Sequence, residues 1–308
     1  MIKGAYTFGS KKIDLAKEFD LLGKLKFEDL FKKTGIKNIY RTEENENSLT
    51  LAIDASQKII KNLNEKIESL LFVSQSHVSS IPASGCLLHE KLNLDKECFV
   101  LDIVQGCSGF PYALLTATNL INSNQFKNCL IVCSETYTKY IDKKDATCAP
   151  IFSDAASAFF INKENIPKIL SSYSYTDGAG AKNLCIEKKN GKNFLFMHGA
   201  KVFTFTAEKI PAATNILLER AKLKMKDVKY FIFHQASSIV LKTIKDKLQI
   251  PENIFFNDIE AFGNTVSSTI PIALIIAEQK KIIPKKEPIL IMGFGVGYSL
   301  CGGIFIFD

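Results

Sequence analysis

The sequence lacks tryptophan entirely and has only four histidines among its 308 residues. The histidines show no metal-ligand spacing, so we expect no metal site. No apolar run reaches the roughly 18 to 20 residues that a membrane helix needs, and the N-terminus has no apolar signal-peptide core. The eight cysteines do not have the spacing of a disulfide framework. We therefore expect a cytoplasmic protein with reduced thiols and no membrane contact.

The charge balance also excludes one class of partner. Lysine and arginine total 39 against 32 aspartates and glutamates, a formal net charge of +7. The cations are scattered, with no arginine cluster and no interleaved aromatic residues, which argues against a nucleic-acid-binding protein. Because 46% of the residues are hydrophobic, the chain can bury a large core, as one big domain or as two joined halves.

Apolar, strand-like runs alternate with helix-like stretches along the chain. The clearest strands are expected at 69–74, 99–104 and 128–134. This alternation predicts an α/β fold whose parallel sheet is covered on both faces. Ser48 is expected to cap one helix, and Pro82 is expected to begin another that runs to Leu92.

The second half of the chain repeats features of the first. Three pairs of similar segments are 160 residues apart: 71–75 and 231–235, 111–114 and 271–274, and 130–132 and 290–292. Residues 101–103 also resemble 257–259, with an offset of 156. We infer a tandem duplication, with an N-terminal half at 1–162 and a C-terminal half at 163–308 related by pseudo-twofold symmetry.

Residues 101–110 are the first candidate for a reactive site. An apolar strand leads to Gly106 and Cys107, and an apolar helix follows from Pro111 to Ile121. The positive end of a helix favours an anion, so a cysteine there is expected to favour the thiolate, the nucleophilic form. The alternative is a cysteine that only packs into a strand-to-helix joint.

His234 and Asn264 belong to the matching part of the second half. His234 follows the counterpart of strand 69–74, and Asn264 lies in the loop that corresponds to the loop of Cys107. Open α/β sheets bind ligands at the carboxyl ends of their strands, so the three side chains are expected to converge. Taken singly, His234 could be a core histidine and Asn264 a turn residue beside Gly263.

Four motifs in this order resemble the signature of thiolase-fold condensing enzymes, and in particular the 3-oxoacyl-(acyl-carrier-protein) synthase III family: 106–110, 234–236, 263–265 and 293–298. Similar segments at 34–36, 81–83, 152–156 and 198–203 extend the resemblance over the whole chain. It implies a thiolase fold, with two βα halves layered α/β/α/β/α. It also implies a homodimer and an acyl carrier protein as partner.

The resemblance further implies a reaction, the decarboxylative condensation of an acyl thioester with malonyl-acyl-carrier-protein. Cys107 would hold the acyl group, and His234 Nε2 and the Asn264 amide would donate hydrogen bonds to the malonyl enolate. The backbone N–H groups of Cys107 and Val296 would form the oxyanion hole. No metal or organic cofactor is implied, because coenzyme A or phosphopantetheine serves only as the carrier of the substrate thioester.

The sequence departs from the family where coenzyme A would bind. The tryptophan and arginine that sandwich the adenine have no counterpart, and Asp29 and Lys33 stand near their places. A second arginine there is matched by Ala146. The resemblance also implies an arginine after the His-Gln-Ala motif that helps to dock the carrier protein, and Ile239 stands in its place. We therefore expect a divergent paralogue that uses another acyl donor in a specialised pathway.

Three further features carry weaker expectations. The resemblance places Ile81 at the dimer interface as a gate of the acyl pocket, where an aliphatic residue predicts a longer acyl chain. Lys242 and Lys245, one helical turn apart, are candidates for carrier-protein docking or simply a solvated face. Residues 176–201 form either a lid over the tunnel or a surface excursion.

Other function classes stay open at this point. A hydroxymethylglutaryl-synthase-like enzyme or another acyltransferase could use the same fold. A noncatalytic partner subunit is a further alternative, but such chains usually lose the cysteine that is kept here as Cys107. A papain-like protease also uses Cys, His and Asn in this order, but its local cysteine signature is missing.

Overall fold

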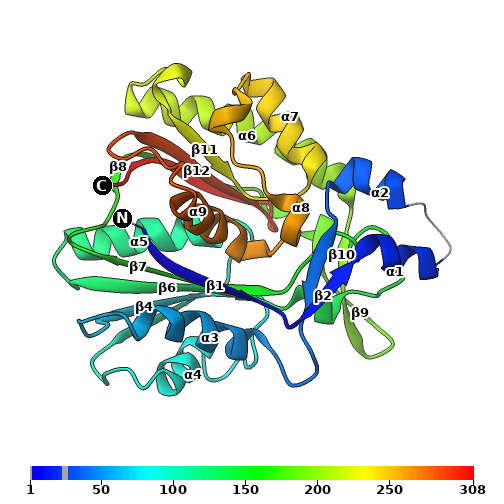
Figure 1. Cartoon of the computed structure of the whole chain (residues 1–308), viewed down its shortest axis with the longest axis horizontal. Helices are drawn as coiled ribbons and strands as arrows, with labels where there is room; N and C mark the ends of the chain where they lie inside the picture. Colours follow the sequence, from blue (N-terminus) through cyan, green and yellow to red (C-terminus); the bar gives the residue numbers. More distant parts are fainter. Residues whose placement is uncertain (1, 23–26) are drawn as a thin grey trace.

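The computed structural model describes residues 2–22 and 27–308. Two β-sheets lie one above the other with a layer of helices between them (Figure 1). The first sheet has the order β1 (Lys3–Phe8), β7 (Ala155–Asn162), β6 (Asn128–Glu135), β4 (Ser69–Val73) and β5 (Phe99–Ile103). The second has the order β11 (Tyr230–Phe233), β12 (Pro288–Gly295), β13 (Ser299–Ile306) and β8 (Lys168–Thr176).

Helices complete a five-layer α/β/α/β/α arrangement, which confirms the predicted thiolase fold class. The middle layer consists of α5 (Gly109–Asn122) and α9 (Thr269–Gln279). The outer layers are α3 (Ser48–Ile60) with α4 (Ser84–Lys91), and α6 (Gly199–Ala221) with α7 (Ser238–Leu248). Residues 269–277 of α9 are all buried, because a helix between two sheets is apolar on every side.

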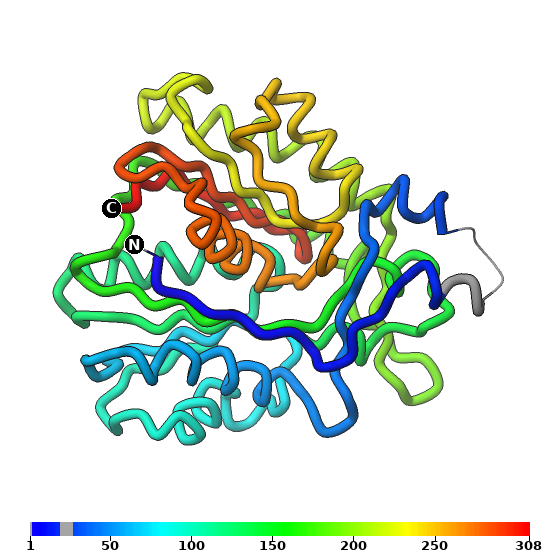
Figure 2. The backbone as a smooth tube through the Cα atoms, viewed as in Figure 1, coloured from blue at the N-terminus to red at the C-terminus, as the bar shows by residue number. Residues whose placement is uncertain are grey.

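Smaller elements gather at one end of the molecule (Figure 1). They are β2 (Lys11–Asp14), α1 (Leu15–Leu22), α2 (Phe27–Thr34), β3 (Asn38–Arg41), β9 (Leu184–Lys189) and β10 (Lys192–Met197). The N- and C-termini lie together on the opposite side (Figure 2). No helix within the described ranges has the length and apolar character to cross a bilayer.

The two sheets draw their strands from opposite sides of the predicted boundary at 162/163. Strand order β1-β7-β6-β4 in the first sheet matches β8-β13-β12-β11 in the second. Strand β5 has no full counterpart, because the second half offers only an isolated parallel bridge between Phe231 and Phe255. The architecture is therefore duplicated, with one edge strand missing from the second copy.

The bridge corrects one detail of the repeat. Leu71 pairs with Leu101 in the first half, and its counterpart Phe231 pairs with Phe255 in the second. Leu101 therefore corresponds to Phe255, an offset of 154, and the offset of 156 was wrong by two residues. The shared Asp-Ile pair in 101–103 and 257–259 is a coincidence of sequence.

The prediction of a parallel sheet is confirmed for β4, β5 and β6, but it is wrong for the rest of the sheet. Strands β7 and β13 run antiparallel to their neighbours. They are reached through connections 136–154 and 296–298, which contain no crossover α-helix of the kind that a parallel connection requires. Strand β5 is not fully covered either, since Leu101 is 40% exposed.

Two predicted helix starts are shifted. Asn47, not Ser48, caps α3, because its side chain accepts hydrogen bonds from the backbone N–H groups of Leu49 and Thr50. The Thr50 hydroxyl accepts from the Asn47 N–H in return, which completes a capping box. Helix α4 begins at Ser84, two residues after Pro82, and ends at Lys91.

Candidate active site

Cys107 lies in the tight turn between β5 and α5, directly before the N-cap residue Ser108. A Cβ at position 106 would lie 2.4 Å from Gln75 Oε1, which accepts the Tyr137 hydroxyl, so a larger residue there would displace the Gln75 side chain. The Cys107 side chain is buried, with 5% exposure. The predicted placement of this thiol at the start of a helix is therefore what the structure shows.

Strand β12 of the second half packs directly against this turn. A Cβ on Gly293 would lie 2.4 Å from the Cys107 carbonyl oxygen, and one on Gly295 would lie 3.0 Å from Cys107 Sγ. These glycines allow two backbones to approach closely. Val296 follows Gly295, and the backbone N–H groups of Cys107 and Val296 lie close enough to the sulfur to lower the pKa of its thiol.

The pKa of the Cys107 thiol is nevertheless raised well above its ordinary value. Burial is the main cause, and the neighbouring carboxylate of Glu135 adds to it. The N–H groups of Cys107 and Val296 lower the pKa, but they do not offset burial. The resting site therefore holds a neutral thiol, and the expected thiolate was wrong because burial outweighs the effect of the two N–H groups.

His234 follows β11 and lies in the same buried region. Its backbone N–H donates to the Met292 carbonyl at 2.9 Å, and its ring packs edge-on against Phe294 at 5.4 Å. The side chain is 2% exposed, and burial lowers the pKa of His234 to about 3. The imidazole is therefore neutral at rest and has one nitrogen free to accept a proton.

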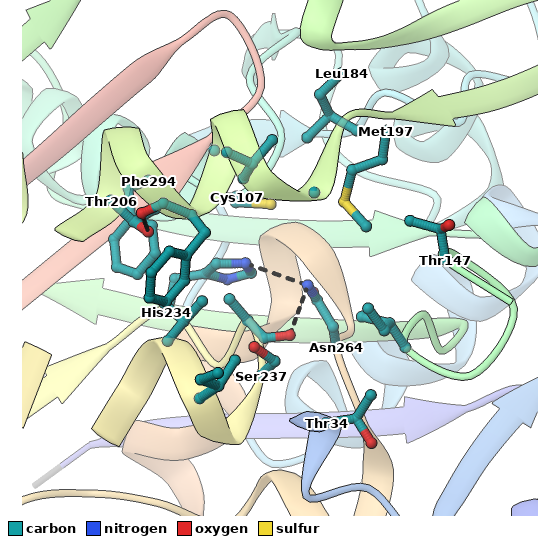
Figure 3. Close-up of a pocket in the computed structure, with 18 of the residues that line it drawn as sticks. Thr34, Cys107, Thr147, Leu184, Met197, Thr206, His234, Ser237, Asn264 and Phe294 are labelled. Carbon is teal, nitrogen blue, oxygen red and sulfur yellow. Dashed lines mark hydrogen bonds between the residues drawn. The ribbon is translucent and has the colours of Figure 1, made fainter. Parts of the chain in front are cut away.

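Asn264 is held so that its amide nitrogen faces this imidazole. Its Oδ1 accepts the backbone N–H of Val266 at 2.8 Å, which directs Nδ2 toward His234 Nε2 at 3.4 Å (Figure 3). Because an amide NH₂ only donates, Nε2 is the acceptor of this contact. At rest His234 Nε2 is thus a proton acceptor and becomes a donor only after it has taken a proton.

Cys107, His234 and Asn264 share one cavity of about 610 Å³. Figure 3 shows their side chains pointing toward one another within it. Most of its wall is apolar, formed by residues such as Phe152, Leu184, Met197, Phe203 and Phe294. Lys33 is the single charged residue that lines it within the described part of the chain.

The structure separates the other predicted residues from this centre. Ile81 is 89% exposed and does not line the cavity, and Lys242 and Lys245 are paired with Asp246 and Glu252. The expectations for a gate and for a docking site stay predictions. Within the described ranges no three metal-ligating side chains come together, and the expectation of no cofactor also stays a prediction.

Three of the positions at which this chain differs from the family lie at or near the cavity. Lys33 and Ile239 line it, and Ala146 is exposed beside the lining residue Thr147. Asp29 instead pairs with Lys32 on the surface of α2. Of segment 176–201, Leu184, Met197, Gly199 and Ala200 form part of the wall, so this segment contributes to the cavity.

Two polar residues of the site were not foreseen. Glu135, at the end of β6, is fully buried and accepts from Gln75 N–H, the Ser76 hydroxyl at 2.8 Å and the Ser267 hydroxyl at 2.9 Å. Burial raises the pKa of Glu135 to about 7. Thr269, the first residue of α9, lies 2.7 Å from His234 Nδ1. In the sequence, Glu135 is recognisable as a single acidic residue at the end of an apolar strand. Thr269 is recognisable as the last of several hydroxyl residues before an apolar helix.

Comparisons with known proteins show the family of the chain. A family model described as 3-oxoacyl-[acyl-carrier-protein] synthase III matches residues 101–178, and a model of its C-terminal part matches residues 218–306. A beta-ketoacyl-[acyl-carrier-protein] synthase III of Clostridium beijerinckii is 30% identical over 285 residues, covering 88% of this chain and 87% of that protein.

Solved structures give the same result. A crystal structure of 3-oxoacyl-(acyl-carrier-protein) synthase III has a TM-score of 0.92 and 27% identity, covering 98% of both chains. The enzyme of the same name from Aquifex aeolicus has a TM-score of 0.90 and 25% identity over 99% of both chains. The chain belongs to the 3-oxoacyl-(acyl-carrier-protein) synthase III family of condensing enzymes.

Proposed function

We propose that this protein catalyses the decarboxylative condensation of an acyl thioester with malonyl-acyl-carrier-protein, giving a 3-oxoacyl thioester. The observation that carries the proposal is the convergence of Cys107, His234 and Asn264 in one buried cavity, with two backbone N–H groups directed at the sulfur. A thiol, a base and hydrogen-bond donors are the groups that acyl transfer through a covalent intermediate needs.

In the first step Cys107 takes the acyl group from its thioester. As Sγ attacks the carbonyl carbon, the thiol proton passes to His234 Nε2, which is the unprotonated nitrogen of the neutral ring. The N–H groups of Cys107 and Val296 stabilise the tetrahedral oxyanion. The carbon–sulfur bond of the donor then breaks, and its thiolate leaves and is protonated by water.

In the second step the malonyl thioester loses carbon dioxide. The electron pair of the broken carbon–carbon bond forms an enolate, whose oxygen accepts hydrogen bonds from Asn264 Nδ2 and from protonated His234 Nε2. The enolate carbon attacks the acyl-Cys107 carbonyl. When the tetrahedral intermediate collapses, the Cys107 thiolate leaves and recovers its proton from His234.

The acyl donor is proposed to be an acyl group on the phosphopantetheine of a carrier protein, not acetyl-coenzyme A. The cavity wall is apolar, with Lys33 as its one charged residue among those described. Ala146 replaces one of the arginines expected around a nucleotide. A pantetheine arm suits such a wall, whereas the phosphates of a nucleotide would meet few cations.

The docking prediction for Lys242 and Lys245 is kept as part of this proposal in a weaker form. Lys242 lies 2.6 Å from Asp246, and Lys245 contacts Glu252. An acidic carrier protein would have to displace both contacts. Solvent screens the exposed pair of Lys242 and Asp246, so a carrier protein can displace it, whereas the Lys245 side chain is only 23% exposed.

A homodimer through β5 completes the proposal, together with the expected cytoplasmic location. Strand β5 ends its sheet and leaves backbone groups unpaired. Apolar side chains are exposed along and beside it, namely Phe99, Leu101, Val104 and Ile81. Pairing of two β5 edges would bury this surface and would bring Ile81 to the partner, as the resemblance implies.

The test is product analysis with purified protein. Acyl-carrier-protein and acyl-coenzyme A donors are each supplied with malonyl-acyl-carrier-protein, and the products are identified by mass spectrometry. We expect a 3-oxoacyl product from the carrier-borne donor and none from Cys107→Ser. A hydroxymethylglutaryl product from acetoacetyl thioesters would contradict the proposed reaction, and fast priming by acetyl-coenzyme A would contradict the proposed donor.

A further inference from the structure

The imidazole of His234 has one polar contact that the reaction described above does not use. Its Nδ1 lies 2.7 Å from the hydroxyl oxygen of Thr269. Thr269 is the first residue of α9, and its side chain is fully buried. The same hydroxyl oxygen lies 3.0 Å from the Val266 carbonyl oxygen. Thr269 therefore stands between the catalytic imidazole and a backbone acceptor.

The direction of these two hydrogen bonds follows from one proton. A carbonyl oxygen only accepts, so the single hydroxyl proton of Thr269 is donated to Val266. The hydroxyl oxygen must then accept from His234, which places the ring proton on Nδ1. On the opposite side of the ring, Asn264 Nδ2 faces Nε2 and donates to it. Two independent contacts thus require the same tautomer, with Nε2 unprotonated.

Val266 links the two contacts through its backbone. Its N–H holds Asn264 Oδ1 at 2.8 Å, and its carbonyl accepts the Thr269 hydroxyl. Its φ of 54° is in the left-handed region, which a β-branched residue rarely occupies. Strained backbone of this kind persists where the surroundings over-determine it, often at functional sites. One strained residue therefore fixes the orientation of Asn264 and, through Thr269, of His234.

We propose that Thr269 is a positioning residue that holds His234 in the tautomer with the proton on Nδ1. Only this tautomer leaves Nε2 able to take the proton of the neutral Cys107 thiol. Once Nε2 is protonated, the chain from Nδ1–H through the Thr269 hydroxyl to the Val266 carbonyl supports the cationic ring. Thr269 thus performs the part of the third group that orients a catalytic base.

The proton balance over the cycle depends on this arrangement. The proton leaves Sγ for Nε2 when Cys107 is acylated, stays on Nε2 while the enolate forms, and returns to Sγ when the condensation product is released. The Nδ1 proton does not move. A ring with its proton on Nε2 could not accept from Cys107, so the acylation step would fail first. This consequence rests on the proposed function, whereas the resting tautomer does not.

The test compares Thr269→Val, which keeps the shape and removes the hydroxyl, with Thr269→Ser, which keeps the hydroxyl. Thr118→Val is the matched control, because Thr118 is a fully buried threonine of the same helix layer whose hydroxyl has no hydrogen-bond partner. The single-turnover rate of Cys107 acylation is followed by intact-protein mass spectrometry. We expect Thr269→Val to acylate about tenfold to a hundredfold more slowly, from the typical effect of losing a buried hydrogen bond.

We expect Thr269→Ser and Thr118→Val to stay within about threefold of the parent, since neither loses a hydrogen bond. Unchanged acylation in Thr269→Val would overturn the proposal. So would an equal loss in Thr269→Ser, because a merely structural role would not be rescued by the retained hydroxyl.

A second measurement needs neither substrate nor variant. Nitrogen-15 NMR of the histidine-labelled parent is expected to show His234 with a protonated Nδ1 and an unprotonated Nε2 at neutral pH. A protonated Nε2 in the resting protein would overturn the inference whatever product the enzyme makes. Conversely, the expected tautomer in a protein that forms no 3-oxoacyl product would leave the tautomer assignment standing and reject the proposed function.

Discussion

The two halves of the molecule contact each other at two equivalent places that carry different residues. We call the contact of Cys107 with Gly295 the reactive crossing and the contact of Ser267 with Glu135 the structural crossing. Cys107 and Ser267 are 160 residues apart, as are Glu135 and Gly295. Cys107 lies against Gly295, whose missing Cβ would be 3.0 Å from the sulfur, while the Ser267 hydroxyl donates to Glu135 at 2.9 Å. At the reactive crossing Gly295 has no side chain, so the N–H groups of Cys107 and Val296 can lie close to the thiol. At the structural crossing the Ser267 hydroxyl and the Glu135 carboxylate are hydrogen-bonded to each other.

The connections after these positions differ in the same way. β12 leads to β13 through only 296–298, which brings the Val296 N–H to the sulfur. β6 leads to β7 through the long segment 136–154, which supplies Phe152 to the cavity wall. A duplicated frame therefore yields one reactive crossing and one structural crossing, because this connection is short in the second half and long in the first.

The largest loss of activity is expected when the thiol of the reactive crossing is replaced. Cys107→Ser should lower condensation at least about a thousandfold, as removal of a covalent nucleophile does. Ser267→Ala, the change at the equivalent position, should keep activity within about threefold, because its hydroxyl bonds only Glu135. Steady-state rates of both variants check this, and comparable losses would contradict the assignment of the two crossings.

A second test adds a side chain at the reactive crossing, opposite the Cys107 sulfur. Gly295→Ala would place a Cβ 3.0 Å from Cys107 Sγ, so either the thiol or the segment that carries Val296 must move, and the alignment of sulfur and N–H is disturbed. Loss of one oxyanion donor typically lowers kcat about 10²- to 10³-fold, and we expect a loss near the lower limit. The measurement is kcat, with circular dichroism as the control for folding; unchanged kcat would show that Val296 supplies no essential donor.

The structural crossing is tested through pH. Because the folded pKa of Glu135, about 7, is above its ordinary value of 4.5, its contribution to stability is fully present below pH 4.5 and is lost as pH rises to 7. The loss amounts to about 3 kcal/mol. Urea unfolding at pH 5 and pH 8 should show a larger decrease for the parent than for Glu135→Gln. Equal decreases would contradict the buried carboxylate.

The smallest effect concerns the edges of the two sheets. Leu101 of β5 is 40% exposed, whereas its counterpart Phe255 is 6% exposed, so this edge is open in the first half and covered in the second. Val104→Lys, at a residue 58% exposed beside this edge, should weaken the dimer at least about tenfold by burying a charge. Ile186→Lys, at an exposed isoleucine of β9, is the control. The association of parent and variants is measured by sedimentation equilibrium. A monomeric parent would contradict the predicted dimer interface.

Much of this arrangement could be predicted from the sequence. The apolar runs at 69–74 and 128–134 marked the central strands, and their repetition at a fixed offset predicted the duplicated frame. Cys107, His234 and Asn264 were brought together by the same reasoning. These predictions succeeded because periodicity and repetition are properties of local sequence.

Other features depend on contacts between distant segments and could not be predicted. The neutral state of the Cys107 thiol results from enclosure by Gly295 and its neighbours, and the acceptor role of His234 Nε2 results from Thr269 and Asn264. The loss of the edge strand in the second half was hidden by the resemblance of 257–259 to 101–103. Packing and hydrogen-bond direction decide each of these points.

The central claim is that Cys107 carries the acyl group while residues of the other half drive its transfer. The most direct measurement isolates the acylated parent protein, maps the adduct by peptide mass spectrometry, and then adds malonyl-acyl-carrier-protein. The account predicts one acyl group on the peptide that contains Cys107, discharged as 3-oxoacyl product by the parent and retained by Asn264→Ala. An adduct on another residue, or equal discharge by Asn264→Ala, would contradict it.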